Sequence, residues 1–558
     1  MKKMFLVAVA LALAPVSVFA KGGTVSAADP RAAAAGQQIL REGGSAADAS
    51  MAMMLALTVV EPQSSGIGGG GFIVYHDSKR GKVATIDGRE TAPAAATPSL
   101  FLDDQGKSMG FREAVPGGRS VGVPGNIALM ARTHAKWGKL KWEKLFEPAI
   151  RLADNGYQVT PRLANSLKLV APIWRDFPSA QAIYWQDGRA KAVGETVKNP
   201  ALAALLRMVA AKGPRAFYSG ENAKAIVAAT TQSKRNPAAM TLKDLAAYRA
   251  KPRDAVCAPY RTYKLCGMGP PSSGATTVFQ ILGMLERFDM KALGKDSPQS
   301  WHLIGEAMLL AYADREKYLG DADFVKVPVT GLLNKSYVAS RSALISPTSA
   351  LGSYGPGTPP GAPARTAAVQ NEVPSTTHFV AVDGSGNIAS MTSTVEGPFG
   401  SQLVVNGYVL NNELTDFTFA PEKDGAPVAN RVQGGKRPLS SMSPTIVYNA
   451  SGKPVFAVGA AGGKTIIMQV AKTLIAHLDW GLSAADALAT ANIYYTGNTI
   501  VIEGGTSVAA MAPQIAALGQ TVLTRDQMPA KANAAELTAD GWRGAADPRS
   551  EGEALSID

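Results

Sequence analysis

A threonine at the head of an apolar segment is the most informative residue of this 558-residue chain. Thr376 opens residues 377–382, which have the composition of a strand, and a Gly-rich turn leads to a second strand, 387–394, that ends in Thr394. If the peptide bond between Ser375 and Thr376 is cut, the freed α-amine lies beside the Thr376 hydroxyl and can accept its proton. The pattern therefore predicts a threonine nucleophile at the start of a β-hairpin.

Other catalytic chemistries have weaker support in the sequence. Gly462-Gly463-Lys464-Thr465 resembles a phosphate-binding loop, but that pattern requires a glycine where Val458 stands. No Gly-x-Ser-x-Gly motif accompanies the many serines, so a histidine-based triad is a weak interpretation. The five histidines have no metal-ligand spacing, and zinc catalysis therefore has no support.

A series of short motifs runs through the chain. Downstream they are Thr376-Thr377-His378, Asn411-Asn412-Glu413-Leu414-Thr415-Asp416-Phe417, Lys436-Arg437-Pro438-Leu439-Ser440-Ser441-Met442-Ser443-Pro444-Thr445 and Gly459-Ala460-Ala461-Gly462-Gly463. The others are Gly68-Gly69-Gly70-Gly71-Phe72, Arg89-Glu90-Thr91-Ala92-Pro93, Pro270-Pro271-Ser272-Ser273-Gly274 and Asp547-Pro548-Arg549-Ser550. Together, and in this order, they resemble the γ-glutamyltransferase family of N-terminal-nucleophile hydrolases.

The resemblance implies a fold and a processing step. The family has an α+β fold, a four-layer αββα sandwich, made from one precursor that cuts itself. Carried over, the cut falls between Ser375 and Thr376 and yields a large subunit, residues 21–375, and a small catalytic subunit, residues 376–558. Thr394 matches a threonine that hydrogen-bonds the nucleophile. Gly462 and Gly463 match the oxyanion hole, in which backbone N–H groups hold the negatively charged tetrahedral intermediate.

The resemblance also implies a charge clamp for an amino-acid head group. Arg89 matches the residue that binds the substrate α-carboxylate, for which a planar guanidinium is well suited. Ser440 and Ser441 match hydroxyls that share this carboxylate. Glu413 and Asp416 match the acids that hold the α-ammonium group. Together these residues form a complementary set for a zwitterion.

Two departures from the family pattern bear on specificity. Glu396 stands where the family usually has asparagine, so it adds negative charge near the ammonium subsite. The segment from Phe417 to Lys436 is shorter than in members with a long lid, which predicts a more open pocket. Either difference is compatible with another acyl donor.

The leading hypothesis is an enzyme that transfers and hydrolyses the γ-glutamyl group of glutathione and related amides through a γ-glutamyl-threonine intermediate. Water, an amino acid or a peptide amine would accept the group, and no metal or organic cofactor is required. One alternative is a cephalosporin acylase-like amidase on the same scaffold. Another is an exported binding protein that keeps the scaffold and is never cleaved.

The elements that must position these groups follow from periodicity and turn residues. Helical spacing covers Pro30–Arg41, Ala46–Val60, Trp142–Asn155, Pro200–Lys212, Ala223–Ala229, Ile466–His477 and Ala484–Ile493. Gly43-Gly44 separates the first two helices, and Ser45 is a plausible N-cap of the second. Strands are expected at 72–75, 80–93, 377–382, 387–394, 403–410, 444–448, 454–459 and 499–502. Residues 352–366 form a Pro/Gly-rich linker directly before the expected cut.

The N-terminus and the charge balance indicate an exported protein. Lys2 and Lys3, an apolar run over 5–15 and Val18-Phe19-Ala20 have the order of a cleavable signal peptide, residues 1–20, so a periplasmic or secreted location is expected. The formal net charge is +12, but the Lys and Arg residues are scattered, and we expect neither a nucleic-acid nor a membrane partner.

Two cysteines, Cys257 and Cys266, flank a Pro-containing turn in a segment typical of a hairpin. In an oxidising compartment they could pair across it as a local disulfide. A metal site is not expected there, because no histidine is near.

Overall fold

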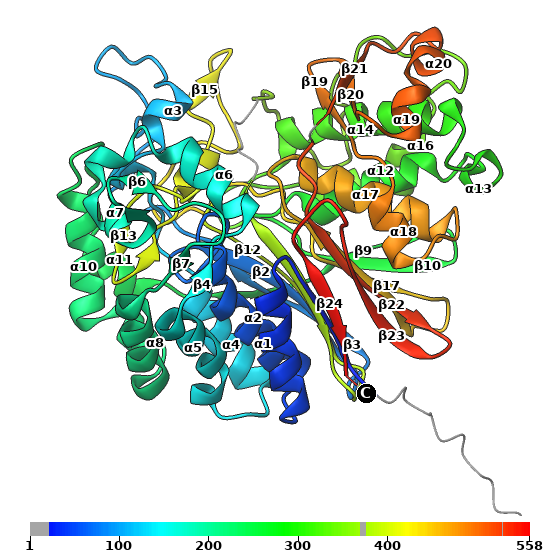
Figure 1. The fold of residues 1–558 in the computed structure, drawn as a ribbon. Helices are drawn as coiled ribbons and strands as arrows, with labels where there is room; N and C mark the ends of the chain where they lie inside the picture. The colour runs from blue at the N-terminus through cyan, green and yellow to red at the C-terminus, as the bar shows by residue number, and fades with distance from the viewer. Residues whose placement is uncertain (1–21, 369–374, 527, 558) are drawn as a thin grey trace, which may run out of the picture.

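A computed structural model describes residues 22–368, 375–526 and 528–557. Two antiparallel β-sheets lie face to face at its centre, and helices cover the outer face of each sheet (Figure 1). This order of layers confirms the αββα sandwich expected from the resemblance. The expected signal peptide lies outside the described residues.

The first sheet has the strand order β24-β1-β11-β12-β2-β3-β8, with antiparallel neighbours throughout. The strands are β1 (Thr24–Ala27), β2 (Gly70–Asp77), β3 (Lys82–Gly88), β8 (Lys251–Arg253), β11 (Thr377–Val382), β12 (Ile388–Thr394) and β24 (Glu553–Ser556). Strands β11, β12 and β24 follow the Ser375–Thr376 bond in sequence, and the other four precede it. One sheet is therefore built from segments on both sides of that bond.

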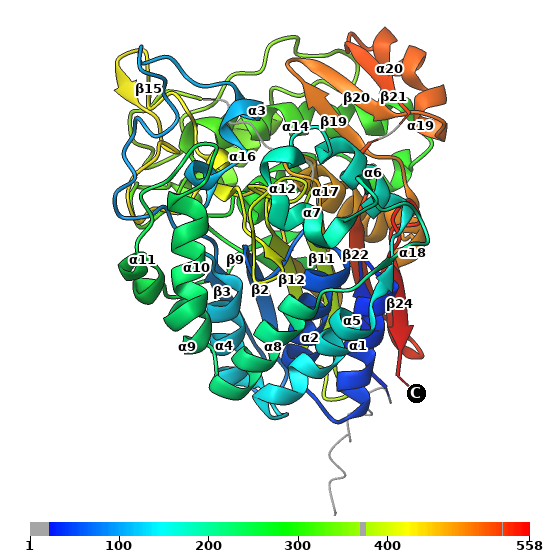
Figure 2. The ribbon, with the colours of Figure 1, turned by 60° about the vertical axis from the view of Figure 1, so that its left-hand side comes forward.

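Helices α1 (Pro30–Arg41), α2 (Ala46–Val60) and α4 (Asn126–Trp137) cover the outer face of this sheet, and α5 (Glu147–Asn155) and α8 (Pro200–Lys212) pack outside α2 (Figure 2). The Asp29 side chain caps α1 by accepting from the Arg31 N–H, and Ser45 and Asp48 form a capping box at α2. Gly43 lies between the two helices with φ 87°. These local signals explain why both helices begin and end where the sequence predicts.

The second sheet has the order β23-β22-β18-β17-β10-β9. Its strands are β9 (Val256–Tyr260), β10 (Tyr263–Gly267), β17 (Thr445–Tyr448), β18 (Pro454–Ala460), β22 (Ala532–Thr538) and β23 (Gly541–Ala546). Helices α12 (Gly274–Leu285), α17 (Thr465–Leu478) and α18 (Ala484–Ala489) cover its outer face, and α14 (Pro298–Tyr318) packs against α12. Buried Phe72 and Val380 of the first sheet share one apolar core with Ile446 and Val458 of the second. Burial between the sheets therefore fixes how the two halves of the chain lie against each other.

Two sequence expectations for secondary structure are wrong in detail. Residues 403–410 form two short strands, β13 (Val404–Val405) and β14 (Tyr408–Val409), because the chain turns at Asn406 and Gly407, which both have positive φ. The helix expected over 484–493 ends at Ala489, and Ile493 begins β19 (Ile493–Thr496).

Cys257 and Cys266 lie opposite each other on β9 and β10 and form a disulfide. The hairpin expected from the sequence is therefore present and cross-linked.

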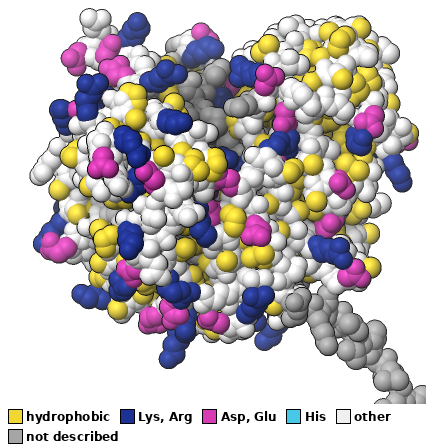
Figure 3. Space-filling view, viewed as in Figure 1, with side chains coloured by type: hydrophobic (Ala, Val, Ile, Leu, Met, Phe, Trp, Pro, Cys, Tyr) yellow, Lys and Arg dark blue, Asp and Glu magenta, His cyan; other side chains and the backbone are white. Residues whose placement is uncertain are grey.

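Among the described residues, no helix combines the length and the hydrophobicity that crossing a bilayer requires. On the face in Figure 3, basic and acidic side chains are interspersed.

Candidate active site

Thr376 directly precedes β11, one residue before the strand that it was expected to open. Its Oγ1 lies 2.9 Å from Thr394 Oγ1 at the end of β12, because the hairpin pairs Thr377 with Ser393. The Glu396 N–H donates to Thr394 Oγ1 at 2.8 Å, which fixes the Thr394 hydroxyl oxygen beside Thr376. The hairpin thus brings the two predicted threonines together.

The backbone of Thr376 has an unusual conformation. Its φ of 81° lies in the left-handed region, which a β-branched side chain strongly disfavours. Thr376 is 5 % exposed, and the preceding Ser375 is anchored by its hydroxyl, which donates to the Gln63 carbonyl at 2.9 Å. The surrounding structure therefore holds the Ser375–Thr376 bond in a strained geometry.

A glycine loop between β18 and α17 forms another wall of the site. Gly462 and Gly463 have φ values of 131° and 60°, and a Cβ on Gly462 would lie 2.6 Å from Thr465 Oγ1. Within the part of the chain that the structure describes, neither glycine N–H has an acceptor. Gly463 lines the cavity beside Thr376 and Gly462 directly precedes it, so the loop lies where it could bind an oxygen atom.

Arg89 follows β3 and is almost fully buried, with 1 % exposure. Its guanidinium forms ion pairs with Glu413 and Asp416, and it also donates to the carbonyls of Pro438 (3.2 Å) and Leu439 (2.9 Å). Burial disfavours its charge, but the charges of Glu413 and Asp416 outweigh this effect and raise the pKa of Arg89. The predicted clamp residues therefore meet in one charged cluster.

The cluster contains more acidic than basic groups. Burial raises the pKa of both Glu413 and Glu90 above the usual range of a carboxyl group. Glu396 adds a further carboxyl, which accepts a hydrogen bond from the Asn412 amide. A bound ammonium group would therefore meet several acceptors.

Ser440 and Ser441 lie beside this cluster. An isolated β-bridge joins Ser440 to Ser272, and the Ser440 carbonyl accepts from the Ser273 N–H at 2.8 Å. Ser441 Oγ accepts from Arg315 at 2.8 Å, and Arg315 also donates to Ser273 Oγ at 2.8 Å. The two serines are thus held in place by the turn before α12 and by α14.

One small cavity brings the predicted residues together. It is lined by Arg89, Thr376, Thr394, Glu396, Glu413, Asp416, Ser440, Ser441, Met442, Gly463 and Ile466. Its volume of about 20 Å³ is far below that of typical ligand pockets, so the intact chain is closed around Thr376. The more open pocket expected from the short 417–436 segment stays a prediction.

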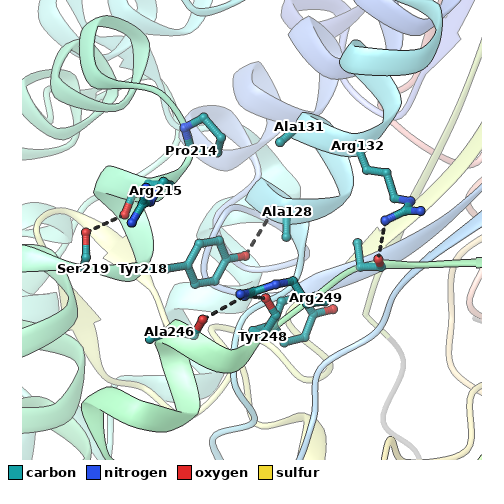
Figure 4. A pocket seen from close by; sticks show the side chains of 11 residues that line it. Ala128, Ala131, Arg132, Pro214, Arg215, Tyr218, Ser219, Ala246, Tyr248 and Arg249 are labelled. Carbon is teal, nitrogen blue, oxygen red and sulfur yellow. Dashed lines mark hydrogen bonds between the residues drawn. The ribbon is translucent and has the colours of Figure 1, made fainter.

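A larger cavity of about 450 Å³ lies between α4 and the segments 214–219 and 246–250 (Figure 4). Tyr248, part of its lining, donates its hydroxyl to the Arg89 carbonyl at 2.7 Å. The lining includes Arg132, Arg215 and Arg249 but no carboxylate or histidine. It therefore offers no nucleophile with a base beside it.

Sequence reasoning did not single out several buried charged residues around the site. Arg315 contacts Ser441, and the ion pair of Glu61 and Lys531 lies against Thr376. Glu61 directly follows the fully buried helix α2. Lys531 is the one charged residue among the small and uncharged residues 529–535. A charge in such a setting is a signal in itself, because buried charges need partners.

Comparisons with known proteins agree with the geometry. The family model described as gamma-glutamyltranspeptidase matches residues 32–557. The chain is 38% identical over 484 residues to a glutathione hydrolase proenzyme of Bacillus subtilis (strain 168), covering 85% of this chain and 81% of that protein. It is 37% identical over 552 residues to the glutathione hydrolase proenzyme of Escherichia coli (strain K12), with coverages of 96% and 91%.

A solved structure, that of cephalosporin acylase from Bacillus halodurans, superposes with a TM-score of 0.84 at 27% identity. The match covers 98% of this chain and 99% of that chain. The whole chain, on both sides of the Ser375–Thr376 bond, therefore has the layout of a known proenzyme scaffold.

Proposed function

The chain belongs to the gamma-glutamyltranspeptidase family, which makes it an enzyme of γ-glutamyl transfer and hydrolysis, and we propose that Thr376 is its nucleophile. The observation that carries the assignment is the 2.9 Å contact between the Thr376 and Thr394 hydroxyls in a cavity that Arg89, Glu413 and Asp416 line. In this setting one hydroxyl lies beside a charge cluster suited to an amino-acid head group.

The first step of the proposal is self-cleavage. Thr376 Oγ1 attacks the Ser375 carbonyl carbon, the hydroxyl proton passes to the Thr376 nitrogen, and the C–N bond breaks to leave an ester. Water then hydrolyses this ester, which gives Ser375 a carboxylate and Thr376 a free amine and hydroxyl. The products are a large subunit, residues 21–375, and a small subunit, residues 376–558.

Turnover follows from the new N-terminus. The α-amine has a reference pKa near ~8, so part of it is neutral and accepts the hydroxyl proton while Oγ1 attacks the γ-carbonyl of the donor. Thr394 orients the hydroxyl, and the N–H groups of Gly462 and Gly463 hold the oxyanion. The protonated amine then donates to the leaving nitrogen, and water or an acceptor amine releases the γ-glutamyl group.

The buried charge cluster recognises the head group of the donor. Arg89, Ser440 and Ser441 bind the α-carboxylate, while Glu413, Asp416 and Glu396 bind the α-ammonium group. In the intact chain Arg89 pairs with Glu413 and Asp416 instead. A zwitterion can enter this arrangement without a change in net charge, which limits the penalty for burying it.

The two subunits remain together as a heterodimer in the proposal, and the substrates are glutathione or other γ-glutamyl compounds. Residues 1–20 act as a signal peptide, which places the enzyme in the periplasm or outside the cell.

The test is to compare the wild-type protein with the Thr376→Ala variant. The wild type should give two bands on a denaturing gel, with Thr376 at the N-terminus of the smaller one, and should release p-nitroaniline from γ-glutamyl-p-nitroanilide. Thr376→Ala should give one band and no release. A single wild-type band would contradict self-cleavage, as expected for an unprocessed binding protein.

A second candidate is an amidase that prefers glutaryl over γ-glutamyl amides. The similarity to the B. halodurans acylase structure favours it. Rates on glutaryl-p-nitroanilide and γ-glutamyl-p-nitroanilide decide between the two, because the donors differ only in the ammonium group. Faster turnover of the glutaryl donor would replace the first proposal.

A further inference from the structure

Lys531 lies just before β22 with its ammonium group enclosed beside the nucleophile. It is 1 % exposed, and Nζ donates to Glu61 Oε2 at 2.6 Å, to Ser64 Oγ at 3.2 Å and to the Thr376 carbonyl at 3.0 Å. An ammonium group has three N–H donors, and here each has an acceptor. The side chain is therefore fixed in direction, and one of its three bonds ends on the backbone of Thr376.

The backbone of Lys531 bonds to the glycine loop. Its carbonyl accepts from the Ala461 N–H at 2.9 Å, and Ala461 directly precedes Gly462 and Gly463. Gln469 closes a ring, because it accepts from the Lys531 N–H at 3.1 Å and donates to the Ala461 carbonyl at 2.7 Å. One residue thus spans the distance between Thr376 and the groups that would hold the oxyanion.

Glu61, at the end of α2, completes the arrangement. Its Oε2 accepts from Lys531 and also from Thr377 Oγ1 at 2.9 Å. The ion pair therefore holds two successive residues of the chain, Thr376 by its carbonyl and Thr377 by its hydroxyl. Burial lowers the pKa of Lys531 to about 8, and Glu61 acts against this shift, so the ammonium form prevails at neutral pH.

We propose that Lys531 is a positioning residue for the Thr376 chemistry: it holds the nucleophile against the Gly462–Gly463 loop and keeps a positive charge beside the α-amine that cleavage creates. The inference rests on the proposed function. Lys531 touches neither substrate nor oxyanion and acts through the Thr376 backbone. Its charge disfavours protonation of the neighbouring amine, so a larger share of that amine is the neutral base.

Other charged groups face the same amine, and all remain when Lys531 alone is replaced. They are Glu61 at the end of α2, Arg162 of α6 (Pro161–Val170), Asp29 before α1, Glu396 after β12 and the cluster of Arg89, Glu413 and Asp416. Removing the Lys531 charge should therefore raise the pKa of the amine. The acidic limb of the kcat/KM profile, which reports the free enzyme, should move to higher pH.

The experiment compares Lys531→Met, Lys531→Arg and Lys472→Met with the wild type. Lys472 of α17 is a matched control, because it is also buried and donates to the carbonyls of Ala487, Leu488 and Thr490 away from Thr376. The readouts are the rate of self-cleavage on gels, kcat and KM for γ-glutamyl-p-nitroanilide, the pH profile and the thermal unfolding midpoint.

Lys531→Met should cleave itself more slowly and lose about tenfold or more in kcat, with KM little changed. The acidic limb of its kcat/KM profile should move to higher pH. Lys531→Arg keeps the positive charge, so the acidic limb of its kcat/KM profile should stay near the wild-type pH. Lys472→Met should lower the unfolding midpoint and leave cleavage, kcat and the pH profile of the folded enzyme unchanged. A folded but uncleaved Lys531→Met chain supports the inference equally.

The inference is overturned if Lys531→Met cleaves itself at the wild-type rate with the wild-type pH profile, or if Lys472→Met reproduces its losses. These outcomes differ from failure of the proposed function, which is seen in the wild type alone as a lack of turnover of γ-glutamyl donors. The cleavage rates then still test the role of Lys531.

Discussion

At the scale of single residues, the conformation of Thr376 links its backbone to its chemistry. The φ torsion of 81° is defined by the Ser375 carbonyl carbon, so it exists only while that peptide bond is intact. A β-branched residue in this region carries on the order of 1–3 kcal/mol of strain. Cleavage at this bond removes the torsion and its strain together, which favours the cut over its reversal.

Glu396 is the residue on which donor choice should depend. Replacing it with glutamine should raise KM for γ-glutamyl-p-nitroanilide roughly tenfold, because one charge-assisted contact to the ammonium group is weakened. KM for glutaryl-p-nitroanilide, which has no ammonium group, should change little. Steady-state kinetics on both donors measure the ratio, and Glu422→Gln, at an exposed acid, is the control. Equal effects on both donors would show that Glu396 does not contact the ammonium group.

Residues in recognisable motifs could be predicted from the sequence, and residues outside such motifs could not. Arg89, Thr376 and Asp416 each lie in a run of neighbours that marks them, and the structure brings them into one cavity. Lys531 and Glu61 are 470 positions apart, and neither has a marked neighbourhood. Their contact depends on how the two halves of the chain pack, which no local pattern encodes.

At the scale of elements, local signals explain which boundaries could be predicted. Helices α1 and α2 have caps and a glycine pair between them, so their limits follow from a few residues. Helix α14 was not predicted, because it is buried on most sides and lacks a polar stripe to reveal the helical period. The hairpin at Asn406 and Gly407 could have been predicted, because Asn-Gly between apolar residues is a strong signal for a two-residue turn.

The turn between β18 and α17 should be needed for catalysis more than for folding. Gly462→Ala should lower kcat by roughly 10²-fold, because a side chain at φ 131° displaces the N–H groups aimed at the oxyanion. Gly452→Ala is the matched control, since Gly452 also has positive φ (78°), lies in the turn between β17 and β18 and has no neighbour near its missing side chain. Similar kcat losses in both variants would contradict the assignment.

His378 on β11 should make the sandwich sensitive to acid. Burial lowers its pKa to about 3, whereas the unfolded value is near 6.5, so between these values the unfolded chain binds the proton more readily. Stability should therefore decrease as the pH falls below 6.5, by about 2 kcal/mol from this group between pH 7 and pH 5.

Urea unfolding at the two pH values measures this effect, in the uncleaved Thr376→Ala background so that a single chain unfolds. His378→Gln should remove most of the difference. His134→Gln, which replaces a ring that is 23% exposed, should leave the difference in unfolding free energy between the two pH values in place. An unchanged pH dependence in His378→Gln would assign the acid sensitivity to other groups.

At the scale of the whole molecule, the first sheet joins the two halves of the chain. Strand β1, from before the Ser375–Thr376 bond, lies between β24 and β11 from after it, and β12 from after the bond pairs with β2 from before it. The cleaved enzyme should therefore elute in size-exclusion chromatography as one particle that contains both chains, without a change in volume from the uncleaved Thr376→Ala variant. Separate elution of the two chains in native buffer would contradict this.

The interleaved sheet has a further consequence for how the enzyme acquires its structure. While the chain is continuous, β1, β11 and β24 are tethered, and folding is a first-order reaction of one molecule. Once the bond is cut, regaining the same sheet from denaturant is a second-order encounter of two chains, neither of which can complete it alone. Renaturation yield should then depend on concentration for the cleaved enzyme but not for Thr376→Ala, and the cell has one opportunity to fold each copy.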